Sequence, residues 1–431
     1  MRARYLVLFL VLSACAERAQ LPPGADTGAN PTLPEPNSSL IPTVKVAKAT
    51  GWPEGVTPKA AQGTSVAVFA TGLQHPRWIY VLPNGDVLVA ETSAPERPEE
   101  GKGVKGRAMS MFMKKAGSAV PSANRITLLR DADGDGVPET REIFLQDLNS
   151  PFGMVLVGND FYVANTDAVV RFPYRNGETR ITAKGEKLVA LPAGARNHHW
   201  TKSLTANPDG TKLYATVGSN SNVGENGMDE ETGRAAIWEI DRKSGAHRIF
   251  ATGLRNPNSP RFEPRTNVLW TVVNERDELG SDLVPDYMTS VQSGGFYGWP
   301  YSYYGQNVDK RPEPQRPDLV KQAIKPDYAL GNHVAALGLV FSAGSNLPFG
   351  EGAYVGQHGS WNRRPPSGYN VVFIPFSNGK PSGPPVEMLS GFRSAEGEAY
   401  GRPVGVAIDK RGALLVADDV GNAIWRVTSA R

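Results

Sequence analysis

The sequence has little cysteine, little excess charge and no long hydrophobic segment. One cysteine occurs in 431 residues, which excludes disulfide frameworks, cysteine-type zinc sites and dithiol redox pairs. The formal net charge is only +3, so the chain lacks the basic excess with which nucleic-acid binders neutralise phosphates. No apolar run approaches the roughly 20 residues that a membrane-spanning helix needs. With 40% hydrophobic and 21% charged residues, the composition is typical of a globular protein.

The single cysteine ends a short apolar segment. Two arginines precede the run Tyr5 to Leu12, which is too short to span a bilayer and is typical of a signal peptide. The small residues before Cys15 resemble a bacterial lipobox, in which the cysteine is acylated; an ordinary secretory signal is the alternative. We therefore predict a signal peptide over residues 1–14, lipidation of Cys15, and a lipid-anchored protein on the periplasmic side of the cell envelope. By resemblance to other lipoproteins, Ala16 suggests the outer membrane.

Residues 15–62 are rich in alanine, proline, glycine and threonine. Such a composition buries too little apolar area to offset the conformational entropy lost on ordering. We predict that this segment is a flexible, proline-rich linker between the lipid and the globular part.

From residue 63 to residue 431 the chain repeats one pattern, in which two apolar strands flank a turn of glycine or asparagine. Six such units start near Gly72, Pro151, Pro208, Gly253, Gly338 and Pro403. No stretch alternates strands with amphipathic helices, which excludes a parallel βαβ sheet. The sequence predicts an all-β fold, a six-bladed β-propeller, in which the strand Val66–Ala70 closes the ring against Trp425–Val427. The insertion 94–122 is expected to be a surface excursion or a short helix.

An acidic, glycine-containing segment has the spacing of a calcium loop. Oxygen donors fall at positions 1, 3, 5, 7, 9 and 12 with glycine at position 6, which suits a hard cation. These positions are Asp131, Asp133, Asp135, Val137, Glu139 and Glu142. The flanks are apolar and strand-like, so we expect a structural Ca²⁺ site in a hairpin, with a metal-free turn as the alternative.

Two adjacent histidines, His198 and His199, precede a strand of the third unit. Imidazole is the commonest general base at neutral pH. Neighbouring side chains on an extended chain point to opposite sides, so at most one of the two reaches a given cavity. A solvated loop without a catalytic role is the alternative.

Four loops of successive units each carry an arginine, and such loops converge on one face of a propeller. Together the guanidinium groups could bind one polyanionic ligand through bidentate contacts. They are Arg255, Arg276, Arg363 and Arg402. Pairing of each arginine with a local carboxylate is the alternative.

At this point the motifs resemble those of a known family, the soluble pyrroloquinoline quinone (PQQ)-dependent glucose and sorbosone dehydrogenases, and most closely its sorbosone branch. The resemblance extends from Gly72 to Val427 in the family's order. Its motifs are Asn197–Trp200, Gly253–Pro257, Asn274–Gly280, Gly294–Pro300, Gln357–Arg363 and Gly401–Gly405. It implies a six-bladed propeller, PQQ and Ca²⁺ as cofactors, and oxidation of a sugar or an aldose-type aldehyde. The electron acceptor is not identified by the sequence.

The resemblance also implies roles for single residues. His198 would be the catalytic base, and Arg255 would touch the reactive quinone carbonyl with Asn256 beside it. Further contacts to the cofactor would come from Lys202, Asn362, Arg363 and Arg402. Main-chain oxygens near Arg276 and Asp277 would hold a calcium ion on the quinone.

The chain departs from the glucose-oxidising members at two informative positions. Those members place an aspartate after a strand-end glycine, where it supports the base, whereas this chain has Gly218-Ser219. The lysine that they use for the cofactor is also replaced in the Asn362-Arg363 stretch. Both departures argue against glucose itself as the substrate.

Two other functions fit the same fold. A calcium-dependent lactonase-type propeller would need acidic and amide ligands around the axis, and candidates follow comparable strands: Glu91, Asn165, Asn220, Glu275 and Asp418. A non-catalytic binding propeller on the cell surface is the second alternative, because a fold does not fix a function. The expected partners are a small sugar or aldehyde, an electron acceptor, and a membrane contacted only through the lipid.

Overall fold

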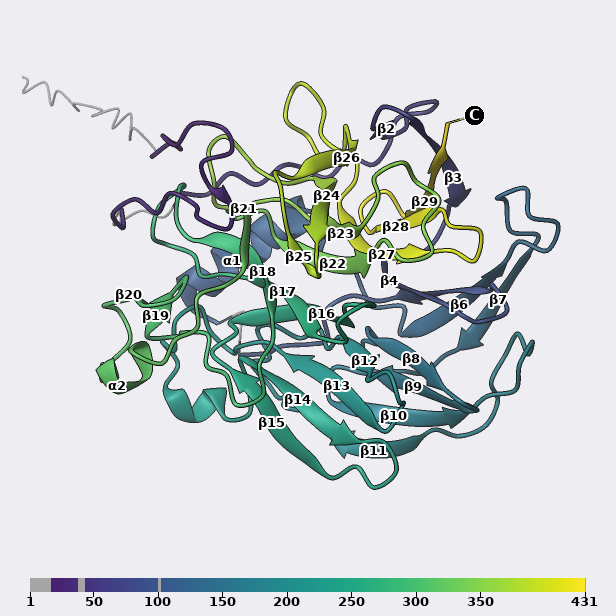
Figure 1. The fold of residues 1–431 in the computed structure, drawn as a ribbon, viewed down its shortest axis with the longest axis horizontal. Helices are drawn as coiled ribbons and strands as arrows, with labels where there is room; N and C mark the ends of the chain where they lie inside the picture. Colours follow the sequence, from purple (N-terminus) through teal and green to yellow (C-terminus); the bar gives the residue numbers. More distant parts are fainter. Residues whose placement is uncertain (1–16, 38–42, 100–101, 431) are drawn as a thin grey trace, which may run out of the picture.

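The computed structural model describes residues 17–37, 43–99 and 102–430. The predicted signal peptide, Cys15 and Ala16 lie outside these residues. Six sheets surround a central axis, with the first strand of each sheet innermost (Figure 1). The first strands of neighbouring sheets contact one another, as β16 (Asn256–Phe262), β22 (Ala336–Phe341) and β27 (Pro403–Ile408) do. The predicted six-bladed β-propeller is therefore confirmed.

The first three blades follow one another along the chain. The first blade consists of β4 (Pro76–Val81), β5 (Val87–Glu91), β6 (Arg125–Arg130) and β7 (Thr140–Leu145). The second consists of β8 (Met154–Val157), β9 (Asp160–Ala164), β10 (Ala168–Pro173) and β11 (Glu186–Ala190). The third consists of β12 (Leu204–Ala206), β13 (Lys212–Val217), β14 (Ala236–Asp241) and β15 (His247–Thr252).

The last three blades complete the ring. The fourth contains β16 (Asn256–Phe262), β17 (Leu269–Asn274), β18 (Pro285–Ser290) and β21 (Tyr328–Asn332). The fifth contains β22 (Ala336–Phe341), β23 (Gly352–Gln357), β24 (Asn370–Ser377) and β26 (Val386–Ser390). The sixth contains β27 (Pro403–Ile408), β28 (Leu414–Asp418) and β29 (Ala423–Ser429), and β3 (Thr64–Ala70) closes it, with Val66 opposite Val427 as predicted.

Short helices and strands lie in the connections between the main strands of the blades. Helix α1 (Gly103–Lys115) forms within the insertion after β5, and it is drawn behind the sheets in Figure 1. The other short elements are a 3₁₀ helix at Met228–Glu231, the hairpin β19 (Ser302–Tyr303) and β20 (Asn307–Val308), α2 (Pro317–Val320) and β25 (Lys380–Pro381). None of the helices in the described ranges is long and apolar enough to cross a bilayer.

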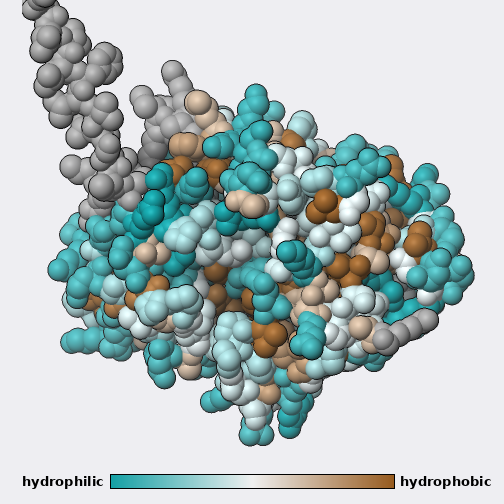
Figure 2. Space-filling view, turned by 90° about the horizontal axis from the view of Figure 1, so that it is seen from above, coloured by the Kyte–Doolittle hydropathy of each residue, from teal (hydrophilic) through white to brown (hydrophobic). Residues whose placement is uncertain are grey.

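Apolar side chains fill the gaps between neighbouring blades, one cluster in each gap. Strand β5 shows why, because its residues alternate between two clusters: Leu88 and Ala90 pack toward the second blade, and Val87 and Val89 toward the sixth. A strand buried on both faces carries apolar residues at successive positions, as these do. On the face that Figure 2 shows, hydrophobic and hydrophilic residues are interspersed.

The described part of the predicted flexible linker is instead packed against the propeller. Strand β1 (Thr27–Gly28) extends the fourth blade beside β21, and β2 (Lys59–Ala60) extends the fifth beside β26. Trp52 contacts the rings of Phe392 and Trp425. The segment buries few apolar residues of its own, but the blades supply the backbone and aromatic partners that its composition lacks. We call residues 43–62 the strap.

A candidate active site at one end of the propeller axis

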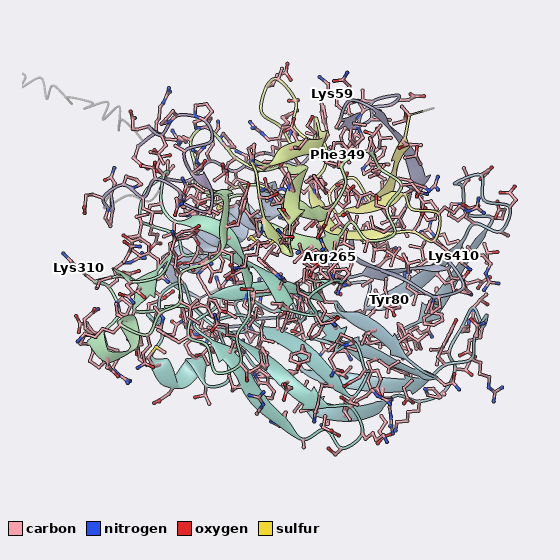
Figure 3. The ribbon with its side chains drawn as sticks, in the orientation of Figure 1. Lys59, Tyr80, Arg265, Lys310, Phe349 and Lys410 are labelled. Carbon is pink, nitrogen blue, oxygen red and sulfur yellow. The ribbon has the colours of Figure 1, made fainter. Side chains whose placement is uncertain are left out.

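A cavity of about 300 Å³ opens at one end of the axis. It lies where the first strands of the blades begin and their second strands end, so each blade contributes from the same two loops. Arg402, for example, precedes β27, and His358 follows β23. Turn residues between first and second strands lie at the opposite end, as do Arg265 and Lys410, which are labelled in Figure 3.

One side of the cavity, the His199 wall, consists of His199, Arg255, Asn256, Glu275 and Asp277. The His199 ring is fixed through Nδ1, which lies 2.8 Å from the main-chain oxygen of Ser219 and 3.0 Å from its Oγ. A carbonyl oxygen only accepts, so Nδ1 carries the proton and donates it to Ser219. Nε2 is then left unprotonated as an acceptor.

The environment of His199 keeps its ring neutral. Burial lowers the pKa of His199 well below 6.5, and the charges of His198 and Arg255 lower it further. Gly218 permits this close packing, because a Cβ there would lie 2.5 Å from the Cβ of His199 and from Oδ1 of Asn256. A neutral imidazole with a free acceptor nitrogen is the state that a general base requires at pH 7.

Arg255 supplies a buried positive charge beside this ring. Its guanidinium donates to the main-chain oxygen of Glu275 at 2.7 Å and to Oδ1 of Asn222 at 3.0 Å, and it lies 3.3 Å from Oδ2 of Asp277. Only 3% of Arg255 is exposed. The arginine is therefore held rigidly in the cavity wall.

The floor beside Asp277 holds a network of fixed polar groups. Asn362 donates to Oδ1 of Asp277 at 2.6 Å and lies 3.3 Å from Nδ1 of His333, whose Nε2 donates to Gly280 at 3.0 Å. Asp286 accepts from the backbone of Glu275 and of Ala335, and burial raises the pKa of Asp286 to about 7.

The facing side, the Asp419 wall, consists of His75, Arg77, His358 and Arg402 around the carboxylate of Asp419. Oδ2 of Asp419 lies 2.7 Å from Arg77 and 2.8 Å from Nε2 of His358, and the main-chain oxygen of Asp419 lies 3.1 Å from Nδ1 of His75. Burial alone would raise the pKa of Asp419, but His358, His75 and Arg77 together lower it. Burial lowers the pKa of His358 to about 4 despite that carboxylate, so the ring is neutral at pH 7.

Arg402 links this wall to the strap. Its guanidinium contacts the hydroxyl of Tyr369 at 3.0 Å, and its backbone N–H donates to Asp418 at 2.8 Å. The other oxygen of Asp418 accepts from the indole of Trp52 at 2.6 Å. Burial raises the pKa of Asp418 to about 6.

Several buried polar atoms of the cavity residues have no hydrogen-bond partner among the described residues. They are Nε of Arg77 and Arg402, Oδ1 of Asn256 and Asn362, and Oε1 of Glu275. Unpaired buried polar groups are costly, so a polar ligand that completes them would bind with a large favourable contribution.

The structure brings most of the predicted site residues together. The cavity lining includes His198, Arg255, Asn256, Asp277, Asn362 and Arg402. The side chains of Lys202, Arg276 and Arg363 are not part of it. Lys202 is fully buried behind His199, where its amine lies 3.4 and 3.2 Å from the main-chain oxygens of His199 and Trp200.

The other two arginines are structural. Arg276 is fully buried and paired with Glu275 at 3.0 Å and with Asp309 at 3.1 Å. Arg363 donates to the main-chain oxygen of Ser281 and pairs with Asp282. The interpretation of Lys202 and Arg363 as direct cofactor contacts, and of Arg276 as part of a polyanion site, is corrected accordingly.

The two adjacent histidines are both held at the cavity. The family resemblance implies His198 as the base, and both His198 and His199 line the cavity. The backbone of His198 is bound by Asn220 and by Arg97, and the ring of His199 is bound by Ser219. The position after the strand-end glycine, Ser219, contacts His199. The chain at Asn197 has a φ of 32°, so it is not extended there, and the alternation rule does not set which histidine faces the cavity.

The acidic loop lies between β6 and β7, in a hairpin as predicted. Ligand oxygens of Asp131, Asp133, Asp135 and Glu139 lie within 4.8 Å of one another. Glu142 does not join them, because it lies on β7 and pairs with Arg180 at 3.4 Å. The N–H of Val137 is bound by Asp135. The calcium site itself stays a prediction, with Glu142 removed from it.

Sequence reasoning identified Arg402 but missed the other members of the Asp419 wall. Its signal was positional: His75 and Arg77 stand where the first unit starts, and Asp419 follows the last unit's second strand. His358 lies in the motif Gln357–Arg363, but the family resemblance implied no role for it.

Comparison with known proteins places this geometry in a family. The sequence model described as TrAA12-like matches residues 58–430. The chain belongs to the TrAA12-like family.

Individual relatives agree with this assignment. A PQQ-dependent pyranose dehydrogenase of Coprinopsis cinerea is 23% identical over 358 residues, which cover 73% of this chain and 44% of that protein. The match therefore spans less than half of that relative's length. The predicted resemblance to PQQ-dependent sugar dehydrogenases is confirmed.

Solved structures share the fold. The holo form of the PQQ domain of the Coprinopsis cinerea pyranose dehydrogenase is 22% identical, with a TM-score of 0.68 over 89% of this chain and 100% of that chain. A calcium structure of a Trichoderma reesei AA12 protein is 18% identical, with a TM-score of 0.70 over 90% of this chain and 99% of that chain.

Proposed function

We propose that this protein is a PQQ-dependent dehydrogenase that oxidises a sugar or an aldose-type aldehyde, of the sorbosone type, by hydride transfer to the quinone. The observation that carries the proposal is the cavity, where a neutral imidazole faces a wall rich in arginine and histidine. Its relatives named above include a PQQ-dependent enzyme, which supports the same cofactor here.

The residues of the cavity fit PQQ, which is a planar quinone with three carboxyl groups. Arg77 and Arg402 would bind its carboxylates, because guanidinium groups suit carboxylates and each retains an unpaired Nε. Arg255 and Asn256 would lie at the quinone carbonyls. When bound, the cofactor supplies the two-electron acceptor, which amino acid side chains lack.

Calcium would bind near Glu275 and Asp277. The main-chain oxygen of Asp277, which the family resemblance favours, already accepts from Asn222 at 3.2 Å and from Arg311 at 2.9 Å. Oε1 of Glu275 has no partner among the described residues and is the better-placed hard donor.

The residues of the His199 wall would act on the substrate as follows. Nε2 of His199 accepts the proton of the hydroxyl that is oxidised, while Nδ1 keeps its hydrogen bond to Ser219. Arg255 holds a fixed positive charge close to the reacting oxygen atoms, which stabilises negative charge as it develops. Trp200 and Leu337 of the cavity lining exclude water from the reacting atoms.

The lactonase alternative finds less support. Of the five residues proposed for its metal ring, only Glu275 lines the cavity. Glu91 is bound by Arg125, and Asp418 holds Trp52. A non-catalytic binding propeller would leave the proton-accepting geometry of His199 without a purpose.

The test is turnover with an electron-accepting dye. Purified protein would be loaded with PQQ and Ca²⁺ and offered a panel of aldoses, sorbosone-type aldehydes and lactones. Reduction of the dye by an aldose or an aldehyde supports the proposal. Quinone-independent hydrolysis of a lactone supports the hydrolase, and no turnover with any member supports the binding propeller.

We also propose that Cys15 is lipidated and anchors the protein to the periplasmic side of an envelope membrane. The support is the lipobox-like segment that ends at Cys15. Membrane fractionation tests it: the parent should sediment with membranes and Cys15→Ser should not.

A further inference from the structure

We propose that the cavity end of the propeller faces the lipid bilayer, with α1 and residues 43–50 of the strap lying against anionic lipid headgroups. This inference rests on the proposed lipidation of Cys15. It adds an orientation that lipidation alone does not provide, because a flexible linker would leave the propeller free to tumble.

The first described residues are tied to the rim of the cavity. The carboxylate of Glu17 accepts from the backbone of Ser281 at 2.8 and 2.9 Å and from its hydroxyl at 3.0 Å. The next residues continue the attachment, since the N–H groups of Gln20 and Leu21 donate to Asp282. Glu17 borders a small recess that shares Asp277, Trp361 and Asn362 with the cavity.

Chain length then fixes where a lipid on Cys15 can lie. Two peptide units separate Cys15 from Glu17, so their Cα atoms are at most about 7 Å apart. The opposite end of the propeller is a full strand away: β16 runs from Asn256 at the cavity to Phe262, about 20 Å at the usual rise. The attachment point of a lipid on Cys15 is therefore nearer to the cavity end than to the opposite end.

The surface at that end has the chemistry of a membrane contact. Phe112 and Met113 of α1 line the cavity, while Met111 is 73% exposed and Lys114 and Lys115 are exposed in the last turn. The strap runs alongside, with Ala49 donating to the main-chain oxygen of Lys115 at 2.9 Å.

Lys45 and Lys48 of the strap are exposed too, although Lys48 lies 3.5 Å from Glu398. An apolar side chain between lysines suits an anionic lipid surface, where each nearby lysine adds to the attraction. An electron acceptor dissolved in the bilayer would then approach the cavity along the membrane surface.

Orientation is measurable because lipidation consumes the only cysteine of the chain. New cysteines at Met111 and, as the matched control at the other end, Lys410 would each carry a small fluorophore. Each lipidated protein would be reconstituted into phosphatidylglycerol-containing vesicles that bear a nitroxide on the headgroups. We expect quenching at position 111 at least about threefold stronger than at 410. Equal quenching, or stronger quenching at 410, overturns the proposal.

A charge test uses the unlipidated Cys15→Ser protein on phosphatidylglycerol vesicles. Lys114→Glu with Lys115→Glu should weaken binding about tenfold or more, since two attractive charges become repulsive. The control reverses two exposed lysines of the second blade, Lys184 and Lys187, and should bind as the parent does. Equal loss in both pairs overturns the assigned face.

These experiments distinguish the proposed orientation from the proposed lipidation of Cys15 and from the proposed dehydrogenase activity. Mass spectrometry and flotation report lipidation, and an unlipidated, non-floating parent overturns the anchor and this inference together. A floating parent with equal quenching overturns the orientation alone. Dye turnover in detergent reports the dehydrogenase activity independently of both.

Discussion

The two walls of the cavity use histidine in opposite ways. On the His199 wall the ring is bound by an uncharged carbonyl, that of Ser219. On the Asp419 wall Nε2 of His358 lies 2.8 Å from the buried carboxylate of Asp419, and Nε2 of His75 lies 3.6 Å from the same carboxylate. Both His199 and His358 have lowered pKa values because both are buried. The partner makes the difference: a carbonyl leaves a free, neutral acceptor, and a carboxylate ties the ring into a charged network.

The difference assigns the two walls to different tasks. A network in which Asp419 is compensated by Arg77 cannot easily give up or take a proton without leaving a buried charge unpaired. It suits rigid binding of a charged ligand. On the His199 wall Nδ1 is held by Ser219 and Nε2 is an unprotonated acceptor, so this wall suits proton transfer.

The largest expected effect is on turnover. His199→Ala should lower the dye-linked rate by about 10²–10⁴-fold, the usual contribution of a positioned general base, and leave quinone binding nearly unchanged. Steady-state kinetics of the PQQ-loaded enzyme measure it. His198→Ala is the matched control and should stay within a few-fold of the parent; the reverse pattern would restore His198 as the base.

The second-largest expected effect is on stability, and it comes from removing the carboxylate at the centre of the Asp419 wall. Asp419→Asn leaves Arg77 without its buried counter-charge and should lower the free energy of unfolding by about 3–5 kcal/mol. Chemical denaturation measures it. Glu186→Gln, which removes an exposed partner of Arg171, should cost less than about 1 kcal/mol. Similar losses in the two variants would contradict the role of Asp419.

A third substitution gives the His199 ring a carboxylate partner, as the His358 ring has on the Asp419 wall. Ser219→Asp places a carboxylate beside Nδ1, which favours the protonated ring and should raise the pKa of His199 by about 1–3 units. Because only the neutral ring accepts a proton, the acidic limb of the kcat/KM profile should move to higher pH. Ser219→Asn is the uncharged control, and a limb that stays in place in both variants argues against His199.

A fourth substitution weakens the support of Arg402 in the Asp419 wall and leaves the His199 wall unchanged. Trp52→Ala removes the indole that binds Asp418 and should lower the free energy of unfolding by about 2 kcal/mol, since the ring is half-buried. We expect weaker quinone binding through Arg402, with the acidic limb of the pH profile unchanged. A melting curve identical to the parent's would mean that the strap does not stabilise the propeller, as the flexible-linker prediction holds.

The smallest effect lies away from both walls. Millimolar Ca²⁺ should raise the melting temperature of the parent, because only the folded loop gathers the four carboxylates. Asp131→Ala should remove the part of the rise that this loop contributes, with Glu142→Gln unaffected as the control. A parent insensitive to chelator would leave the loop a metal-free turn.

The blades were predictable from sequence, and the orientation of the two adjacent histidines was not. Each strand such as Val87–Glu91 is buried on both faces, so its apolar run and terminal turn appear directly in the sequence. The choice between His198 and His199 depended on the backbone at Asn197, whose positive φ no residue pattern announced. The strap was misjudged because composition does not show that Trp52 packs against Phe392 and Trp425, which lie far along the chain. Asp419 acts through long-range contacts, which sequence spacing does not reveal.

The most direct measurement is a titration of the purified apoprotein with PQQ in the presence of Ca²⁺, followed by the quinone spectrum and by the fluorescence of Trp200 and Trp361, which line the cavity. The account predicts saturable binding at one equivalent per chain, weakened at least tenfold in Arg402→Ala and unchanged in His199→Ala. A flat titration, or binding that ignores Arg402→Ala, would contradict the assignment of this cavity to the quinone.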